Sequence, residues 1–333
     1  MTSSSVNKVR ISVPASSANL GPGFDVLALA LNIRLEVTAE WSPEQVNLKD
    51  FDDPLDWWHK AVEPNCNYGG TLLDFSIEHS GEPNLLATAF VKAVLRGGPE
   101  YHLPKELKAT IKSDIPIAQG LGSSAAATVA GAAIAEMWRK GTADKNDVFT
   151  DATEIEGHPD NAAAATYGGL QASLSIGKDM RATPLKMHED LRVALAVPNQ
   201  TLKESTGATR IWLPEKLNRK EAVSNQRALL TLLYGLKTGE KDAIAAGFDD
   251  RLHVPHRKAR IAGFDEIVTA AVEAGAYGVT ISGAGGAMIA LGTGDMMPIA
   301  SAMKESYERH GMEAQALAPE IDKQGLIVEV LKG

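Results

Sequence analysis

Several features are scarce in this sequence, and each absence excludes a class of protein or of site. Among 333 residues there is one cysteine, Cys66, which rules out an internal disulfide and a cysteine metal cluster. So few cysteines are typical of a reducing compartment. The longest apolar run, VLALAL, is too short to span a bilayer, and the N-terminal MTSSSVNKVR lacks the apolar core of a signal peptide. We therefore expect a cytoplasmic protein with no membrane partner.

Excess positive charge is also missing. The formal net charge is -9 and the chain contains no long basic cluster, which argues against nucleic acid or an anionic membrane as the main partner. Hydrophobic residues make up 44% and charged residues 23%, as in ordinary soluble proteins. A chain of 333 residues suits two domains. We expect them at residues 1–169 and 170–333, divided after the Gly168-Gly169 pair.

Two familiar nucleotide signatures are absent: the Walker A pattern and the H-R-D plus D-F-G set of protein kinases. What the chain does have is a glycine-rich turn, GLGSSA at residues 120–125, directly before an alanine-rich run. Convergent amides and the positive end of a helix favour phosphate binding there. A buried helix capped by Ser123 or Ser124 is the alternative. The turn also fits the dinucleotide pattern G-x-G-x-x-A, but SDIPIAQ separates it from the preceding strand, which disfavours that interpretation.

Hydrophobic periodicity predicts an α+β protein. Strands are expected at residues 9–13, 33–41, 107–111, 170–175 and 192–197, and helices at 84–95, 148–156 and 220–247. A polar loop lies between the first two strands. The order helix, two strands, helix, strand over residues 264–317 predicts a compact layer sandwich. We interpret Trp57-Trp58 as local packing and the pair His253 and His256 as an ordinary loop, with no third ligand nearby for a metal.

Four motifs together resemble a known family. The first is PASSANLGPGFD at residues 14–25, the second is the glycine-rich turn, the third is EGHPDN at 156–161 and the fourth is SGAG at 282–285. They are similar, in the same order, to the motifs of the GHMP small-molecule kinases in the form found in homoserine kinases. One departure is Gly286-Ala287, where the family usually has proline and then serine or threonine.

The resemblance implies a two-domain fold, with an N-terminal α+β domain whose sheet has a left-handed crossover and a C-terminal ferredoxin-like α/β sandwich. It implies ATP-dependent phosphorylation of the side-chain hydroxyl of L-homoserine, with Mg2+, for threonine synthesis. A homodimer is expected from relatives. Two alternatives stay open: a kinase for another small alcohol, such as mevalonate or a sugar, and a non-catalytic nucleotide-binding protein suggested by Gly286-Ala287.

The resemblance also assigns the ATP site. Asn84 would line the purine pocket, or would simply start a helix. Ser124 would lie near Mg2+ with one glutamate, either Glu156 or Glu154, which cannot share a helix face because they are two residues apart. The residues expected to wrap the phosphates are Pro116, Ile117, Ala118, Gly120, Leu121, Gly122, Ser123, Ser124 and Ala125.

The substrate site is assigned in the same way. Asp25, with Asn19, matches the family's ammonium-binding position, and Arg210 and Arg257 match two arginines for the carboxylate. Three residues are expected near the reacting hydroxyl or in catalytic stretches: Asn161, Thr206 and His158. Since phosphoryl transfer needs little deprotonation before attack, we predict no dedicated strong base.

Overall fold

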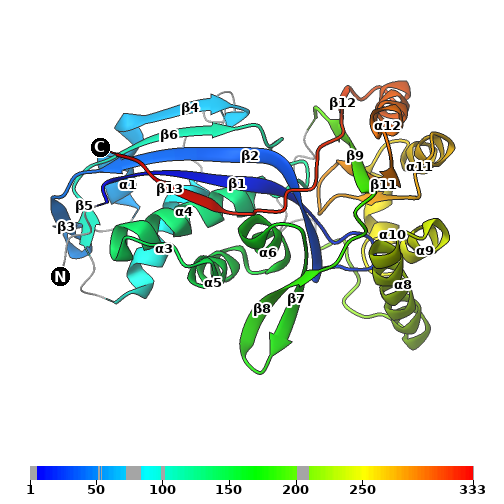
Figure 1. Cartoon of the computed structure of the whole chain (residues 1–333), viewed down its shortest axis with the longest axis horizontal. Coiled ribbons are helices and arrows are strands. Elements are labelled where there is room, and N and C mark those ends of the chain that lie inside the picture. Colours follow the sequence, from blue (N-terminus) through cyan, green and yellow to red (C-terminus); the bar gives the residue numbers. More distant parts are fainter. Residues whose placement is uncertain are drawn as a thin grey trace.

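The computed structural model describes residues 6–51, 53, 55–72, 84–98, 102–200 and 210–332. Within these residues the strands form two main sheets and one small pair, β3 (Gln45–Asn47) with β5 (His102–Pro104). Figure 1 shows the two main sheets in separate lobes of an elongated molecule. No helix in this part of the chain is long and apolar enough to cross a membrane.

The first lobe is built on a mixed sheet with the strand order β13-β1-β2-β6-β4. β7 pairs with the start of β2, and β8 pairs with β7 to make a projecting hairpin (Figure 1). Among the described strands of this sheet, only β4 runs parallel to its neighbour, β6. The strands are β1 (Lys8–Ala18), β2 (Leu27–Trp41), β4 (Cys66–Gly70), β6 (Leu107–Ser113), β7 (Leu170–Ile176), β8 (Asp179–Leu185) and β13 (Ile327–Val330).

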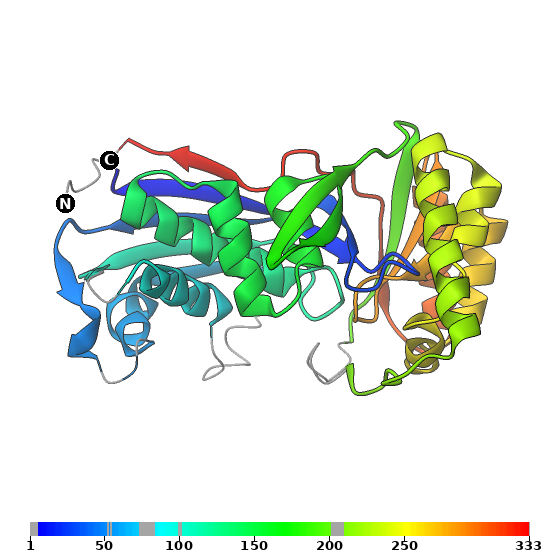
Figure 2. The ribbon, with the colours of Figure 1, turned by 90° about the horizontal axis from the view of Figure 1, so that it is seen from below.

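Helices cover one face of this sheet, as Figures 1 and 2 show. The central one, α4, is buried for most of its length, and its many small residues, alanine above all, let it pack closely. At Gly131 a β-carbon would lie 2.2 Å from the carbonyl oxygen of Leu86, so the small residue lets α3 and α4 pack closely. The helices are α1 (Asp56–Ala61), α3 (Leu85–Arg96), α4 (Ser123–Lys140), α5 (Lys145–Glu156) and α6 (Asp160–Tyr167).

The tryptophan pair belongs to the core, as predicted. Trp57 and Trp58 are 0% and 1% exposed, and the Trp57 ring stacks on Phe90 at 5.3 Å between centroids. The indole N–H of Trp57 donates to the carbonyl oxygen of Pro104 at 2.7 Å. These contacts fix α1 against α3 and against the small β3–β5 sheet. The two tryptophans therefore serve local packing.

The second lobe contains an antiparallel sheet in the order β10-β11-β9-β12. Strand β9 is followed by helices, then β10 and β11, then α12 and β12, which is the ferredoxin-like order expected from the resemblance. Figure 2 shows the helices on the side of this sheet away from the first lobe. The elements are β9 (Leu191–Pro198), α8 (Arg219–Thr238), α9 (Lys241–Gly247), α10 (Val254–Arg257), α11 (Phe264–Glu273), β10 (Gly278–Ile281), β11 (Met288–Thr293), α12 (Met297–Arg309) and β12 (Ala314–Leu317).

The sequence prediction differs from the structure in several places. The polar loop between the first two strands is shorter than expected, because PASSA completes β1 and LALAL opens β2. The single helix expected at residues 220–247 is two helices, since Gly239 ends α8 in the left-handed conformation with φ +77°. Other elements were not predicted: the helices α1, α6 and α10 and the strands β5, β8 and β13.

The first sheet takes strands from both sides of the predicted domain division. β7 and β8 follow residue 169 yet extend β2, and β13 returns from the second lobe to pair with β1. Arg34 and Asp322 form an ion pair that holds the returning segment against β2. No proline-rich or serine-rich linker marks these crossings, so composition gave no signal for them.

Candidate active site

The glycine-rich turn has the backbone shape that its sequence predicts. Gly120 and Gly122 have φ of +81° and +68°, a region that favours glycine. A β-carbon at Gly120 would lie 2.0 Å from the carbonyl oxygen of Ser282. Helix α4 starts directly afterwards with Gly122 as its N-cap and no side-chain cap, which excludes the serine-capped alternative. The first N–H groups of α4 therefore face the turn, as phosphate binding requires.

The fourth motif, SGAG, holds this turn from the other lobe. The hydroxyl of Ser282 lies 2.8 Å from the carbonyl oxygen of Gly120 and 2.8 Å from the hydroxyl of Ser17. The amide of Gly283 donates to the carbonyl oxygen of Ala18 at 3.1 Å. The end of β1, the glycine turn and the second sheet thus meet at one point, and the turn is preorganised.

The departure from the family pattern does not detach this loop. Ala287 is fully buried, and its amide donates to the carbonyl oxygen of Gln119 at 3.1 Å. The buried phenol of Tyr307, on α12, donates to the carbonyl oxygen of Gly286 at 2.5 Å. Backbone contacts and a tyrosine therefore fix the position where the family usually has proline and a hydroxyl.

The first motif forms a tight loop between β1 and β2. Asn19, Leu20 and Asp25 all have positive φ, of 73°, 44° and 57°, which is uncommon for residues other than glycine. The Asn19 side chain closes the loop: its oxygen accepts from the amide of Asp25 at 3.1 Å, and its nitrogen donates to the carbonyl oxygen of Gly283 at 2.8 Å. Backbone strain of this kind is typical of ligand sites.

The two charges expected to bind opposite ends of an amino acid are paired with each other. Arg210 donates to both carboxylate oxygens of Asp25, at 2.7 and 2.8 Å. This pairing raises the pKa of Arg210 above its usual value. The geometry is the bidentate fork that guanidinium groups form with carboxylates. An ammonium group could share Asp25 with Arg210, whose side chain is about a third exposed at 38%.

Unlike Arg210, Arg257 is buried, at 3% exposed, and has no carboxylate partner among the described residues. One terminal nitrogen, Nη1, donates to the carbonyl oxygen of Gly283 at 3.0 Å and to Nδ1 of His253 at 3.3 Å. Its Nε is buried without a hydrogen-bond partner there. Burial, followed by repulsion from Arg210, lowers the pKa of Arg257 to about 10, so the group is still a cation at neutral pH.

An aromatic ring lies between the two arginines. The Phe24 centroid is 5.4 Å from the guanidinium carbon of Arg210 and 5.5 Å from that of Arg257, within the range of cation–π attraction. The His253 ring is also 5.5 Å from Phe24. Phe24, on the first-motif loop, thus contacts both the guanidinium group of Arg210 and that of Arg257 on α10.

The structure places the two candidate glutamates differently, and the choice of the magnesium ligand stays a prediction. Glu156 lies beside the glycine turn, where one of its oxygens, Oε1, is 2.7 Å from the hydroxyls of both Ser124 and Thr128. Glu154 is exposed, and its charge interacts with that of Arg96 instead. Ser124 and Glu156 therefore form the oxygen-rich pair that fits a magnesium ion bound partly by phosphate.

The EGHPDN motif brings the remaining predicted residues to the same place. Nδ1 of His158 is 2.9 Å from the Asp160 carboxylate, and this contact raises the pKa of His158. The same carboxylate oxygen accepts from the amide of Asn161 at 2.7 Å. The Asn161 side chain accepts from the hydroxyl of Ser16 at 2.8 Å, next to the glycine turn. Thr206 lies outside the described residues.

Asn84 is the N-cap of α3. Its side-chain oxygen accepts from the amides of Leu86 and Ala87 at 3.1 and 3.2 Å, and its nitrogen donates to the phenol of Tyr68 at 3.3 Å. The side chain thus has the structural role that the sequence left open. The purine contact stays a prediction.

Substitutions at Asn84 separate these two roles. We expect Asn84→Ala to lower the free energy of unfolding by about 1 kcal/mol, the usual contribution of such a cap. Asn84→Ser keeps a capping oxygen, so chemical denaturation should show most of that stability restored. A KM for ATP that rises equally in both variants would support the purine contact, whereas an unchanged KM would leave Asn84 as a cap only.

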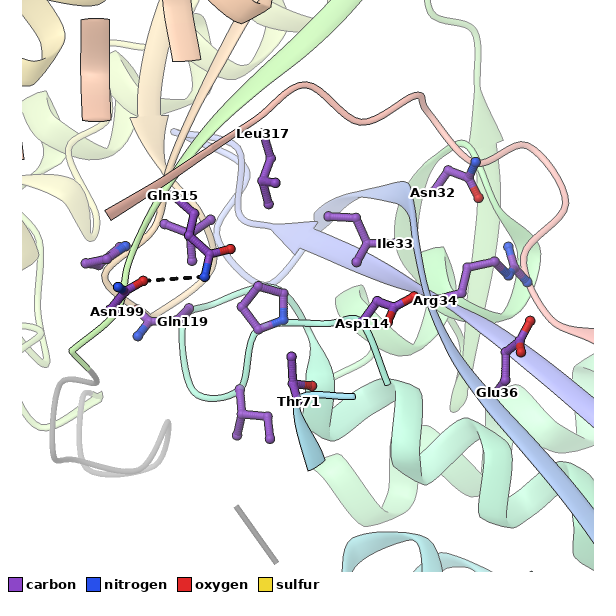
Figure 3. Close-up of a pocket in the computed structure, with 14 residues that line it drawn as sticks. Asn32, Ile33, Arg34, Glu36, Thr71, Asp114, Gln119, Asn199, Gln315 and Leu317 are labelled. Atoms are coloured by element: carbon purple, nitrogen blue, oxygen red, sulfur yellow. Dashed lines mark hydrogen bonds between the residues drawn. The ribbon is translucent and has the colours of Figure 1, made fainter. Parts of the chain in front are cut away.

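A cavity of about 740 Å3 opens between the lobes next to the glycine turn. Figure 3 shows its mixed polar and apolar lining, in which Gln119 lies on one side and Arg34 and Glu36 on the other. Pro116 and Ile117, from the stretch predicted to approach ATP, line it as well. Ala118, at φ 56°, turns the chain between this wall and the glycine turn. The cavity is large enough for a nucleotide base with its ribose.

Comparison with known proteins identifies the family. The GHMP kinase N-terminal domain matches residues 86–169, and the GHMP kinase C-terminal domain matches residues 240–309. A homoserine kinase from Picosynechococcus is 33% identical over 327 residues, covering 97% of this chain and 100% of that protein. The chain belongs to the GHMP kinase family. Another homoserine kinase, from Carboxydothermus hydrogenoformans, is 33% identical over 319 residues and covers 96% of both chains.

Solved structures of GHMP kinases share the fold. The crystal structure of homoserine kinase from Cytophaga hutchinsonii has a TM-score of 0.79 at 24% identity and covers 99% of both chains. Mevalonate kinase from L. major, solved with R-mevalonate, has a TM-score of 0.63 at 13% identity and covers 97% of both chains. At these identities the likeness shows the two-domain fold alone. As a kinase of this family, the protein uses ATP.

Three side chains of this GHMP kinase were missed by the sequence analysis. His253 was interpreted as part of an ordinary loop, yet it is fully buried between the first-motif loop and Arg257. One signal was present: Pro255 favours a helix start, which places residues 253 and 257 on one face. Phe24 and Thr128 gave no comparable signal, because their roles depend on segments far away in the sequence.

Proposed function

We propose that this GHMP kinase transfers the terminal phosphoryl group of ATP to the side-chain hydroxyl of L-homoserine, forming O-phospho-L-homoserine for threonine synthesis. Near-full-length relatives named homoserine kinase support the reaction. Arg257 supports the substrate class: it is a buried cation with an unpartnered Nε and no carboxylate partner in the described part of the chain. A buried unpaired charge is costly, so the site favours a ligand with an anionic group.

The charges around Arg257 favour an amino acid over an uncharged alcohol. Asp25 supplies a carboxylate for an ammonium group, and Arg210 is already held beside it. The Nε edge of Arg257 offers a donor for the substrate carboxylate. Neither mevalonate nor a neutral sugar carries an ammonium group that would use Asp25. The zwitterion of homoserine therefore matches this set of charges better than either alternative.

The glycine turn and α4 would bind the phosphates of ATP through backbone N–H groups. Ser124 and Glu156 would hold Mg2+, which neutralises developing charge on the phosphates when bound. Asn161, held by Ser16 beside the turn, would orient the reacting hydroxyl. The hydroxyl oxygen then forms its bond to the terminal phosphorus as the bond to ADP breaks, and the hydroxyl proton passes late to an oxygen of the transferred phosphoryl group.

No strong base is needed in this scheme, which gives a prediction at Asp160. Its carboxylate is 2% exposed and accepts from His158 and from the amide of Asn161. We expect Asp160→Asn to lower kcat by about tenfold or less, through looser orientation of Asn161. Steady-state kinetics at saturating substrates measure this. Complete loss of turnover in a folded variant that still binds ATP would identify Asp160 as a base instead.

The proposed reaction is tested by ADP release with Mg-ATP on L-homoserine, L-serine, mevalonate, shikimate and galactose. Turnover on homoserine well above the others would support the proposal. Turnover on a substrate without an amino group would reject homoserine and keep the kinase. ATP binding without turnover on any alcohol would favour the non-catalytic alternative.

We also propose a cytoplasmic location, inferred from the sequence, and a homodimer, inferred from the resemblance to the family. Sedimentation at micromolar concentration tests the dimer. A monomer under those conditions would reject it without affecting the proposed reaction.

A further inference from the structure

A buried histidine links the two lobes at the substrate site. His253 is 0% exposed, and its Nε2 is 2.9 Å from the carbonyl oxygen of Gly21, in the first-motif loop. Its Nδ1 is 3.3 Å from Nη1 of Arg257, one helical turn away. A carbonyl oxygen only accepts and a guanidinium only donates. Both contacts are therefore satisfied together by one form of the ring: neutral, with its proton on Nε2.

This contact decides which edge of Arg257 is free. Nη1 carries two hydrogens, and it has two acceptors, Nδ1 of His253 and the carbonyl oxygen of Gly283. Phe24 lies against the guanidinium at 5.5 Å. What remains is the edge formed by Nε and Nη2, and Nε is the buried atom that lacks a partner among the described residues. That edge has the two parallel N–H groups that bind a carboxylate.

We propose that His253 is a positioning residue for the substrate carboxylate: by accepting from Nη1, it turns the Nε–Nη2 edge of Arg257 toward the ligand. Its second contact ties that edge to the loop that carries Asp25. The distance between the ammonium and carboxylate subsites would thus be set partly by one imidazole. The inference rests on the proposed function and deepens it, because it names what orients the carboxylate-binding group.

The charges around His253 support the neutral ring. The Asp250 carboxylate lies 3.9 Å from Nε2, but it already accepts from the amides of His253 and Val254 at 2.8 and 2.6 Å. Arg257 faces Nδ1, and Asp25 lies farther away in the same site. Burial, aided by Arg257, outweighs the two carboxylates and lowers the pKa of His253 to about 4. A protonated Nδ1 would point a hydrogen at a guanidinium donor and break the contact.

Two amide substitutions separate the two contacts. His253→Gln keeps a donor near the position of Nε2 and loses the acceptor for Arg257, whereas His253→Asn keeps an acceptor near Nδ1 and loses the link to Gly21. We expect His253→Gln to raise the KM for homoserine about tenfold and His253→Asn about threefold. The KM for ATP should change by less than about twofold in both, which a general loss of structure would not produce. His256→Gln, at an exposed neighbour, is the matched control.

A second measurement does not depend on turnover. Nitrogen-15 NMR of the wild-type protein at about pH 7 should report a neutral His253 ring protonated on Nε2. A ring protonated on Nδ1 or on both nitrogens would overturn the proposal, as would equal effects of the Gln and Asn variants on the KM for homoserine. If the wild-type protein does not turn over homoserine, the proposed function fails, while the NMR result still decides the geometry of His253 and Arg257.

Discussion

Arg257→Ala is expected to raise the KM for homoserine about 100-fold or more, because losing a buried, hydrogen-bonded charge opposite a ligand charge costs 2–5 kcal/mol. The KM for ATP should change little, since Arg257 contacts the fourth motif and α10 rather than the glycine turn. ADP release measures both constants: the KM for homoserine at varied homoserine and saturating ATP, and the KM for ATP at varied ATP and saturating homoserine.

Arg257→Ala should lose affinity for homoserine without a matching loss of folding stability. In the free protein, Arg257 is 3% exposed and has no carboxylate partner in the part of the chain that is described, so its burial opposes folding. We expect the midpoint of chemical denaturation of Arg257→Ala to stay the same or to rise. Activity and stability would then move in opposite directions, as happens where a site keeps a costly group for its ligand.

Two further variants serve as controls. Arg257→Lys keeps the charge without the planar fork. We expect its affinity for homoserine to reach about a tenth of the wild-type value or more. Arg260→Ala removes an exposed arginine three residues away, which stacks on Trp212 at 4.4 Å, and should leave both KM values unchanged. A Arg257→Ala variant that weakens ATP and homoserine equally would contradict the assignment to the substrate carboxylate.

How far the sequence predicted this site depends on how local each feature is. The glycine-rich turn and α4 were predictable, because the positive φ of Gly120 and Gly122 and the helix start are encoded within a few residues. The order of helices and strands over residues 264–317 followed from periodicity in the same way, whereas the ferredoxin-like arrangement was implied by the resemblance. These features depend on neighbours in the chain.

Long-range features were not predictable from the pattern. β13 is recognised as a strand only by its pairing with β1, more than 300 residues earlier, and its own four residues give a weak signal. The resemblance assigned Asp25 and Arg210 to opposite ends of the substrate, but their mutual ion pair spans 185 positions. Which of two nearby glutamates faces Ser124 depended on how α5 ends, and only the three-dimensional structure separates Glu156 from Glu154.

The different positions of Glu156 and Glu154 lead to the second prediction with a large expected effect. Glu156→Gln is expected to lower kcat about 100-fold or more and to raise the Mg2+ concentration for half-maximal rate about tenfold or more, because Mg2+ bound to phosphates is held by only one or two protein carboxylates. The substitution keeps an oxygen that can accept from Ser124 and Thr128, so the glycine turn should keep its shape. Rates at saturating ATP over a range of free Mg2+ measure both effects.

Glu154→Gln is the matched control, because it makes the same chemical change two residues away on an exposed position. We expect its kcat and its Mg2+ dependence to stay within about twofold of the wild-type values, as for most surface substitutions. If Glu154→Gln shows the loss and Glu156→Gln does not, the metal ligand is Glu154 and the end of α5 must rearrange when nucleotide binds. If neither variant is affected, the carboxylate for Mg2+ comes from another segment, and the contact of Glu156 with Ser124 serves only to fix the first turn of α4.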